Sequence, residues 1–466
     1  MRIQISAKSH SFLNSILAIT LLLCSLSMSE LSGSELLPVL ITYSLICFLW
    51  SFVTREYFFS IPILFIRITE FVRYYVIAYI MSTSGIRIHD SSVILIMTVE
   101  MVSVNFGLFL YVFRHVNANQ SDDGESLRSM TTTQNFHVGI ASFIVLVVGM
   151  ITVITNPSII NKFFYVFRGS GELYQTDNGL IGLIINSFLL LLLLSVFVFI
   201  ERKQQIPKAL RVIVIVIVGG IYALGSSIST NDMSRWGLVI NLYFLYIVII
   251  RFHPEIKRGM LIVFALAGVA IILFGTTLKY QQIFSNTGIY NKGILELSSY
   301  RTLNAYFSGP SNMIVGNRVI ENLNVPRLYV LISDLFANCP ILNRYIGDPS
   351  INSVALFNYQ VYGSTIAIDQ IMPLACQMRL YFGWLFFVPE IAFSYYAVKL
   401  YTKAMKTQNL LLLYCLIKVS FAFSRIDCIN LNIIMQNIWI GTIPVLIIYL
   451  IDYRWTHSWV RIKQIP

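Results

Sequence analysis

The feature that most constrains this chain is a series of about twelve apolar runs, most of them close to 20 residues long. A helix needs about 20 apolar residues to cross the hydrocarbon of a bilayer. Because backbone amides in lipid must be hydrogen-bonded within the protein, helices are the expected spanning form. We predict spans at residues 12–28, 36–53, 58–81, 93–113, 138–155, 180–200, 212–229, 236–250, 260–277, 380–398, 410–423 and 431–451.

Composition favours an all-α integral membrane protein. Hydrophobic residues make up 56% of the chain and charged residues only 12%, whereas a soluble domain carries about 25% charged residues. The β-branched run 212–218 also fits a buried strand, but it continues through 219–223 without a turn signal, which favours a helix. The first run follows Arg2 and Lys8 without a small-residue cleavage site, so we expect an uncleaved anchor.

The distribution of basic residues predicts the orientation. With both termini in the cytoplasm, 18 of the 33 Lys and Arg residues fall in inside segments. The short outside loops hold five: Arg87, Lys162, Arg168, Arg235 and Arg425. Since basic residues collect on the cytoplasmic side, we predict a multi-pass inner-membrane protein with both termini cytoplasmic. These anchors account for the formal charge of +11, so we do not predict nucleic-acid binding.

A long segment, residues 279–379, separates the ninth and tenth predicted spans. It contains apolar clusters at 328–335 and 351–357, so we expect it to fold as a large extracytoplasmic cap. Connections of this length are usually functional. The predicted divisions are a membrane bundle at 1–278 with spans one to nine, the cap at 279–379, and spans ten to twelve with a cytoplasmic tail at 380–466.

The six cysteines do not indicate a metal site, because no CxxC or Cys/His spacing occurs. We therefore do not expect a zinc site. Cys339 and Cys376 both lie in the predicted cap. They could form a disulfide in an oxidising compartment or remain free thiols.

Ionisable residues inside the predicted spans are costly and need partners or a function. They are Arg67, Glu70, Arg73, Glu100, Glu390 and Lys418. One interpretation is mutual pairing; Glu70, three residues from each arginine, can then bridge both. Another is a cationic path, in which Lys418 and Arg425 share a helix face, that opens to the outer leaflet and binds a pyrophosphate headgroup.

The run 301–313 (RTLNAYFSGPSNM) combines side chains that bind sugars. Arg301, Asn304 and Asn312 can hydrogen-bond hydroxyl groups, and Tyr306 and Phe307 can stack on sugar rings. An ordinary helix followed by a turn is the alternative. At the short turn 231–235, Arg235 is expected at the membrane surface, either as an interfacial anchor beside Trp236 or as a functional cation.

The segments YFSGPSNM (306–313), SRWG (234–237) and DQIMPLACQMRLYFGWLFF (369–387) resemble the O-antigen repeat-unit polymerases of the Wzy type. The resemblance extends to about twelve spans, cytoplasmic termini and a late external loop, a GT-C-like polytopic architecture. Arg168 and Gly179 are similar to a spaced Arg/Gly pattern of some members, which the long segment does not repeat.

The resemblance implies a glycosyltransferase of surface-polysaccharide synthesis. It would transfer a growing glycan from undecaprenyl pyrophosphate to a lipid-linked oligosaccharide repeat unit, without a nucleotide sugar, a metal or a cofactor. Its partners would be these lipid-linked oligosaccharides, membrane lipid and a chain-length regulator protein.

Residue roles follow from the same resemblance. Arg235 and Arg301 would stabilise the leaving pyrophosphate, and Asp369 would be the base, in competition with Asp334, Asp348 and Glu321. Arg73 and Arg379 would line the lipid entrance. The other expected substrate-binding residues are Arg67, Arg168, Tyr306, Asn312 and Lys418.

Two other functions share parts of this pattern. A lipid-linked oligosaccharide flippase has a similar number of spans but does not need a cap of about a hundred residues. An O-antigen ligase shares the late external loop, but that family is usually associated with a histidine there, and 279–379 contains none.

Overall fold

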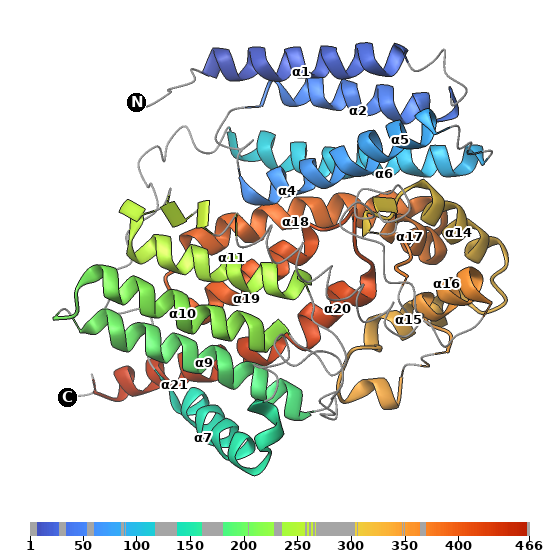
Figure 1. The fold of residues 1–466 in the computed structure, drawn as a ribbon. Helices are drawn as coiled ribbons and strands as arrows, with labels where there is room; N and C mark the ends of the chain where they lie inside the picture. The colour runs from blue at the N-terminus through green and yellow to red at the C-terminus, as the bar shows by residue number, and fades with distance from the viewer. Residues whose placement is uncertain are drawn as a thin grey trace, which may run out of the picture. The chain divides into compact units, whose positions relative to one another are not determined.

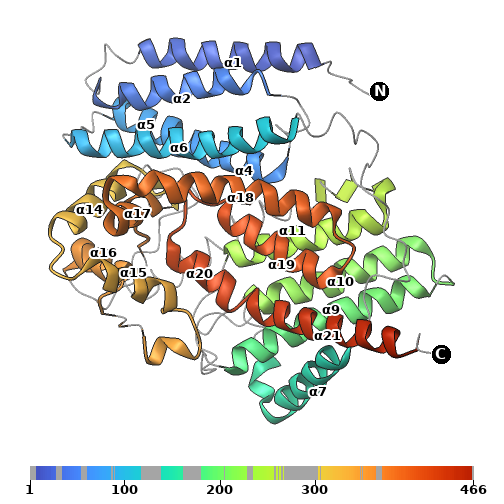
Figure 2. The same ribbon diagram turned by 180° about the vertical axis from the view of Figure 1, so that it is seen from behind.

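The computed structural model describes residues 7–27, 34–53, 60–84, 88, 90–116, 138–160, 180–203, 205–227, 235–256, 259–260, 262–263, 266, 303–304, 306–346, 348, 350–363 and 370–463. All regular structure in these residues is helical, and no strand occurs among them (Figures 1 and 2). The chain forms two compact units. Unit 1 contains Met1–Gly124, Leu295–Thr402 and Val419–Gln436, and unit 2 contains Glu125–Ile294, Lys403–Lys418 and Asn437–Pro466.

Within the part of the chain that the structure describes, four helices are long and apolar enough to cross a membrane by length and composition. They cover Ser91–His115, Ile181–Arg202, Lys208–Ser227 and Leu431–Trp455. Shorter apolar helices cover Asn14–Ser27, Leu37–Trp50, Ile140–Thr155, Trp236–Phe252 and Leu410–Phe423. These features fit a helical membrane protein. The helix predicted at 212–229 is confirmed as α10 (Lys208–Ser227), and the strand alternative is wrong.

Unit 1 holds the N-terminal helices and the helices of the long segment. The first group is α1 (Ala7–Ser27), η2 (Ser34–Leu36), α2 (Leu37–Trp50), α4 (Ile61–Glu70), the π-helical η3 (Phe71–Val76), α5 (Ile77–Thr83) and α6 (Ser91–Val116). The second is α14 (Pro310–Glu321), α15 (Arg327–Phe336), η8 (Leu342–Arg344), α16 (Ser353–Tyr362), α17 (Leu374–Phe382) and η9 (Gly383–Phe386). In both views α1 lies beside α2, and α14–α17 form a cluster from which α14 and α17 contact α6 (Figures 1 and 2).

Unit 2 is built on α7 (Ile140–Thr155), η5 (Pro157–Ile160), α9 (Leu180–Arg202), α10, α11 (Arg235–Phe252) and η6 (Pro254–Ile256). Helices α18 (Phe387–Lys406), α19 (Leu410–Phe423) and α20 (Leu431–Trp439) contribute residues to both units, and α21 (Ile443–Lys463) belongs to unit 2. The N-terminus of α7 is capped by Asp452 of α21, whose carboxylate accepts the Ala141 amide at 2.8 Å and the Ser142 amide at 3.2 Å. A carboxylate stabilises a helix N-terminus because it meets unpaired N–H groups and the positive end of the dipole.

Two predicted spans differ from the structure. The tenth, at 380–398, is not one continuous helix, because α17 ends at Phe382 and Gly383 adopts φ +62° before α18 begins. Only glycine adopts this left-handed conformation without strain. The twelfth, at 431–451, is interrupted at 440–442 just before Pro444, which cannot donate a helical hydrogen bond. Nearly all of the ninth predicted span lies outside the described residues.

Gly107 lets α6 and α18 approach closely within unit 1. A Cβ atom at this position would overlap the Ser394 Oγ and the carbonyl oxygen of Ile391. Gly220 in α10 is the matched contrast, because a Cβ there would meet nothing within 4 Å.

We predict that Gly107→Ala lowers the free energy of unfolding by about 1–3 kcal/mol, because a backbone oxygen cannot move aside without shifting a helix. Gly220→Ala should be neutral or stabilise by up to about 1 kcal/mol through helix propensity. Thermal unfolding of the purified full chain in detergent would measure both variants. Equal melting temperatures for the two would contradict the close approach of α6 and α18.

Candidate functional site

The interior of unit 1 contains an ion pair between Arg73 of η3 and Glu100 of α6. The two guanidinium Nη atoms donate to the two carboxylate oxygens at 3.0 and 2.7 Å, and both side chains are completely buried. Arg73 also donates to the carbonyl oxygen of Asp427 at 2.9 Å. This two-pronged geometry is the strongest form of an arginine–carboxylate contact.

A second pair joins Arg67 to Glu70 at 3.0 Å. Glu70 also accepts a hydrogen bond from Asn105, so it does not bridge both arginines, and that prediction is wrong. The reason is the π-helical turn over Phe71–Val76. A π-helix bonds residue i to i+5, which displaces Arg73 from the stripe that a regular α-helix would give.

Mutual pairing is therefore the interpretation that the structure bears out for Arg67, Glu70, Arg73 and Glu100. Glu390 is also completely buried, and neither of its carboxyl oxygens has a hydrogen-bond partner among the described residues.

Lys418 and Arg425 do not share a helix face. Helix α19 ends at Phe423, so Arg425 lies in the turn beyond it. The Lys418 ammonium donates to the Tyr414 hydroxyl at 2.8 Å, and the two residues are one helical turn apart. The prediction failed because it applied helix geometry to Arg425, which lies two residues beyond the predicted span at 410–423 and beyond the end of α19.

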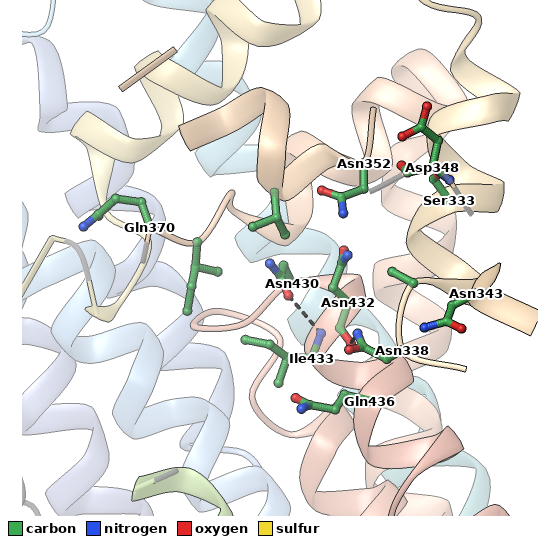
Figure 3. Close-up of a pocket in the computed structure, with 13 residues that line it drawn as sticks. Ser333, Asn338, Asn343, Asp348, Asn352, Gln370, Asn430, Asn432, Ile433 and Gln436 are labelled. Carbon is green, nitrogen blue, oxygen red and sulfur yellow. Dashed lines mark hydrogen bonds between the residues drawn. The ribbon is translucent and has the colours of Figure 1, made fainter. Parts of the chain in front are cut away.

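An amide-lined cavity lies elsewhere in unit 1 and has a volume of about 430 Å³. Seven of its thirteen lining residues carry amide side chains: Asn338, Asn343, Asn352, Gln370, Asn430, Asn432 and Gln436. They come from the segments around α15 and α16, from the stretch before α17, and from the start of α20. Figure 3 shows the labelled side chains arranged around this space. A cavity of this size can hold a small organic ligand.

Part of the amide set builds the wall itself. Asn352 caps α16 by accepting from the Ala355 amide at 2.8 Å, and Asn430 caps α20 by accepting from the Ile433 amide at 3.0 Å. Asn338 donates to the Asn432 carbonyl at 3.0 Å. These bonds fix the positions of the side chains and leave several amide groups for a ligand.

Asp334 in α15 forms hydrogen bonds with residues of three other helices, and one of these residues, Asn432, lines the cavity. Its carboxylate accepts hydrogen bonds from the Tyr381 hydroxyl, from the Ser353 amide at 3.1 Å and from Asn432. The side chain is buried, and burial raises the pKa of Asp334 to about 6 although these donors favour the charged form. One carboxylate therefore joins α15, α16, α17 and α20.

The described residues of the predicted site do not line the cavity. Tyr306 lies just before α14. Asn312 accepts from Asn304 at 3.3 Å, and its amide nitrogen is buried without a partner among the described residues. Arg379 donates to Asn317 and lies over the Trp384 ring at 4.5 Å.

Four predicted site residues are not placed. Arg168, Arg301 and Asp369 lie outside the described residues, and Arg235 is described only as the first residue of α11. Their roles stay predictions.

Sequence reasoning missed the cavity because its lining comes from two segments far apart in the chain, 333–371 and 430–436. The amides of Asn430, Asn432 and Gln436 in NLNIIMQ were the available signal, since a lipid-facing helix rarely carries so many. Of the competing carboxylates, Asp334 is buried, Asp348 accepts from Ser350, and Glu321 accepts from Asn317.

The structure distinguishes between a disulfide and free thiols for the two cysteines of the long segment. Cys339 and Cys376 are both buried free thiols. Among the described residues, no group of three or more His, Cys, Asp or Glu side chains could hold a metal ion.

The chain matches no protein-family model, no curated protein and no solved structure.

The raised pKa of Asp334 predicts how stability depends on pH. Ionised Asp334 is less favourable in the folded protein than in the unfolded chain, whose carboxyl has a pKa of about 3.8. Its contribution is thus most favourable below pH 3.8 and is lost as the pH rises through about 6. A difference of about two pKa units corresponds to roughly 3 kcal/mol.

We predict that Asp334→Asn, which cannot ionise, becomes more stable relative to the native protein as the pH rises from 4 to 7. Thermal unfolding of both proteins in detergent across this range would measure the difference. A difference in melting temperature that stays constant from pH 4 to pH 7 would contradict the assignment.

Proposed function

We propose that this protein is an inner-membrane polymerase that joins lipid-linked oligosaccharide repeat units in surface-polysaccharide synthesis. The observation that carries the proposal is the amide-lined cavity of unit 1. Amide groups donate and accept hydrogen bonds at once, which suits the hydroxyl groups of sugars. The resemblance of the segments at 234–237, 306–313 and 369–387 to Wzy-type polymerases points to the same substrate.

Contacts at helix ends support the proposed topology on the cytoplasmic side. The twelve-span arrangement with cytoplasmic termini assigns a side to every helix end. Four hydrogen-bonded pairs join ends that it assigns to the cytoplasm: Tyr111–Thr402, Ala141–Asp452, Arg251–Thr407 and His253–Glu201. A wrong number of spans between such ends would place partners on opposite faces of the bilayer.

Contacts between helix ends on the outer side also agree with the proposed topology. Three pairs join ends that the same topology puts outside: Glu35–Ile88, Asp90–Asn317 and Asn338–Asn432. All the cavity-lining residues then belong to the outer face, because they come from 333–371 and 430–436. Repeat units would be joined on that face, after export.

The chemistry needs cations for the leaving pyrophosphate and a base for the attacking hydroxyl. Arg67 and Arg73 are each paired with a buried carboxylate, so their charges are already compensated. We assign the pyrophosphate to Arg235 and Arg301, the lipid entrance to Arg379, and the base to Asp369. Arg379 suits its role because its described hydrogen-bond partner, Asn317, is neutral.

Deletion of the gene should leave cells whose surface polysaccharide contains only a single repeat unit. Export and ligation would continue, whereas polymerisation would stop. Electrophoresis of the extracted polysaccharide would measure chain length, and the native gene supplied in trans should restore the ladder. Accumulation of lipid-linked units on the cytoplasmic face would instead support a flippase.

Arg301→Ala should remove long polymer while normal amounts of protein remain in the membrane. Losing a charge-assisted contact to a leaving group typically costs about 2–4 kcal/mol, or roughly 30- to 1000-fold in rate. Arg301→Lys should restore polymer only in part, since an ammonium keeps the charge but loses the two-pronged geometry. Arg235 should behave in the same way. Normal ladders from both alanine variants would remove these residues from the mechanism.

A further inference from the structure

The polar groups that line the cavity of unit 1 are almost all uncharged. Among the described residues, no Lys, Arg or His lines this cavity, and Asp348 is the one ionisable residue of the lining. Hydrogen bonds from Ser350 lower the pKa of Asp348, so it is a carboxylate near neutral pH. The described lining of the cavity therefore offers hydrogen bonds and a negative charge, but no positive charge.

We infer that this cavity binds an uncharged stretch of the glycan, built of neutral hexose or N-acetylhexosamine units, and rejects acidic sugars. The inference rests on the proposed function and names the substrate class of the same site. Transfer of an anionic sugar from water to this cavity would cost free energy without a cationic partner. The pyrophosphate group of the lipid carrier is excluded for the same reason.

Several amide groups are available for such a ligand. The Oδ1 atom of Asn343 is buried and has no hydrogen-bond partner among the described residues. The Asn352 and Asn430 caps use only the side-chain oxygens, which leaves both amide nitrogens for a ligand. Gln436 is exposed on α20 and adds both a donor and an acceptor.

Both kinds of hydrogen-bonding partner are therefore present in one cavity. A sugar hydroxyl donates one hydrogen bond and accepts others, and an N-acetyl group carries one amide donor and one acceptor. Neutral amides match this pattern without requiring a counter-ion. A buried acceptor such as Asn343 Oδ1 costs free energy while it is unpaired, so a ligand hydroxyl that bonds to it contributes to affinity.

Binding to the purified full chain in detergent would test the inference. The probes are labelled neutral oligosaccharides of glucose, galactose and N-acetylglucosamine, two to four units long, and oligogalacturonides of the same lengths. At least one neutral probe should bind at least about tenfold more tightly than every acidic probe. Asn343→Ala and Gln436→Ala should each weaken neutral binding about five- to tenfold.

Asn324→Ala is the matched control, since Asn324 is an exposed amide of the same long segment and does not line the cavity. It should bind like the native chain. Gln436→Lys adds a cation to the cavity, so it should reduce the ratio of the affinity for neutral probes to the affinity for acidic probes. Equal or tighter binding of acidic probes, or no binding of any neutral probe, would overturn the inference.

The polymer ladder distinguishes this result from failure of the proposed function. If the ladder depends on the gene but neutral probes do not bind, only the inference fails. If neutral probes bind but deletion leaves the ladder intact, the cavity binds glycan and polymerase is the wrong function.

Discussion

Arg73 and Glu100 meet through two hydrogen bonds in the interior of unit 1, and neither has exposed surface. An uncompensated charge at bilayer depth costs several kcal/mol, so each residue requires the other. Arg73 also binds the Asp427 carbonyl, and Thr69 donates to the Asp427 carboxylate at 3.1 Å. The turn that precedes α20 is thereby fixed to the N-terminal helices. Because Asn430 and Asn432 follow this turn directly, the cavity depends on an ion pair that does not touch it.

The bilayer explains which elements could be predicted from the sequence. A spanning helix must be apolar over a fixed length, so α2, α6, α9 and α10 lie where the apolar runs predict them. The break at Gly383 and the π-helical turn at Phe71–Val76 leave the hydropathy of their runs unchanged, so the same argument cannot find them. Asp427 escaped notice because it falls between two apolar runs, although it is completely buried. The cavity joins Asn338 to Asn432, which are 94 residues apart, and no local pattern predicts that contact.

The separation of charged and uncharged polar groups bears on how a lipid-linked substrate could be held. Such a substrate has an anionic pyrophosphate near the membrane surface and a glycan that extends from it. Arginines compensated by buried carboxylates offer little attraction for phosphate, since each pair has no net charge. In the proposed function, cations without such partners would bind the pyrophosphate, while the neutral amides would bind the sugars. Two sites of different chemistry can then recognise one molecule without competing for it.

Asp334 lowers the stability of the fold, yet it orients a side chain that lines the cavity. An asparagine at this position would avoid the cost of burying a charge. However, a carboxylate offers two acceptor oxygens, and here it receives the Tyr381 hydroxyl, the Ser353 amide and Asn432 from three different helices. An asparagine has one acceptor oxygen, and its NH₂ group would face donors. The carboxylate therefore fixes the orientation of Asn432, whose side chain lines the cavity, at a cost in stability. Proteins commonly accept such a cost where a side chain must be held in one orientation for binding.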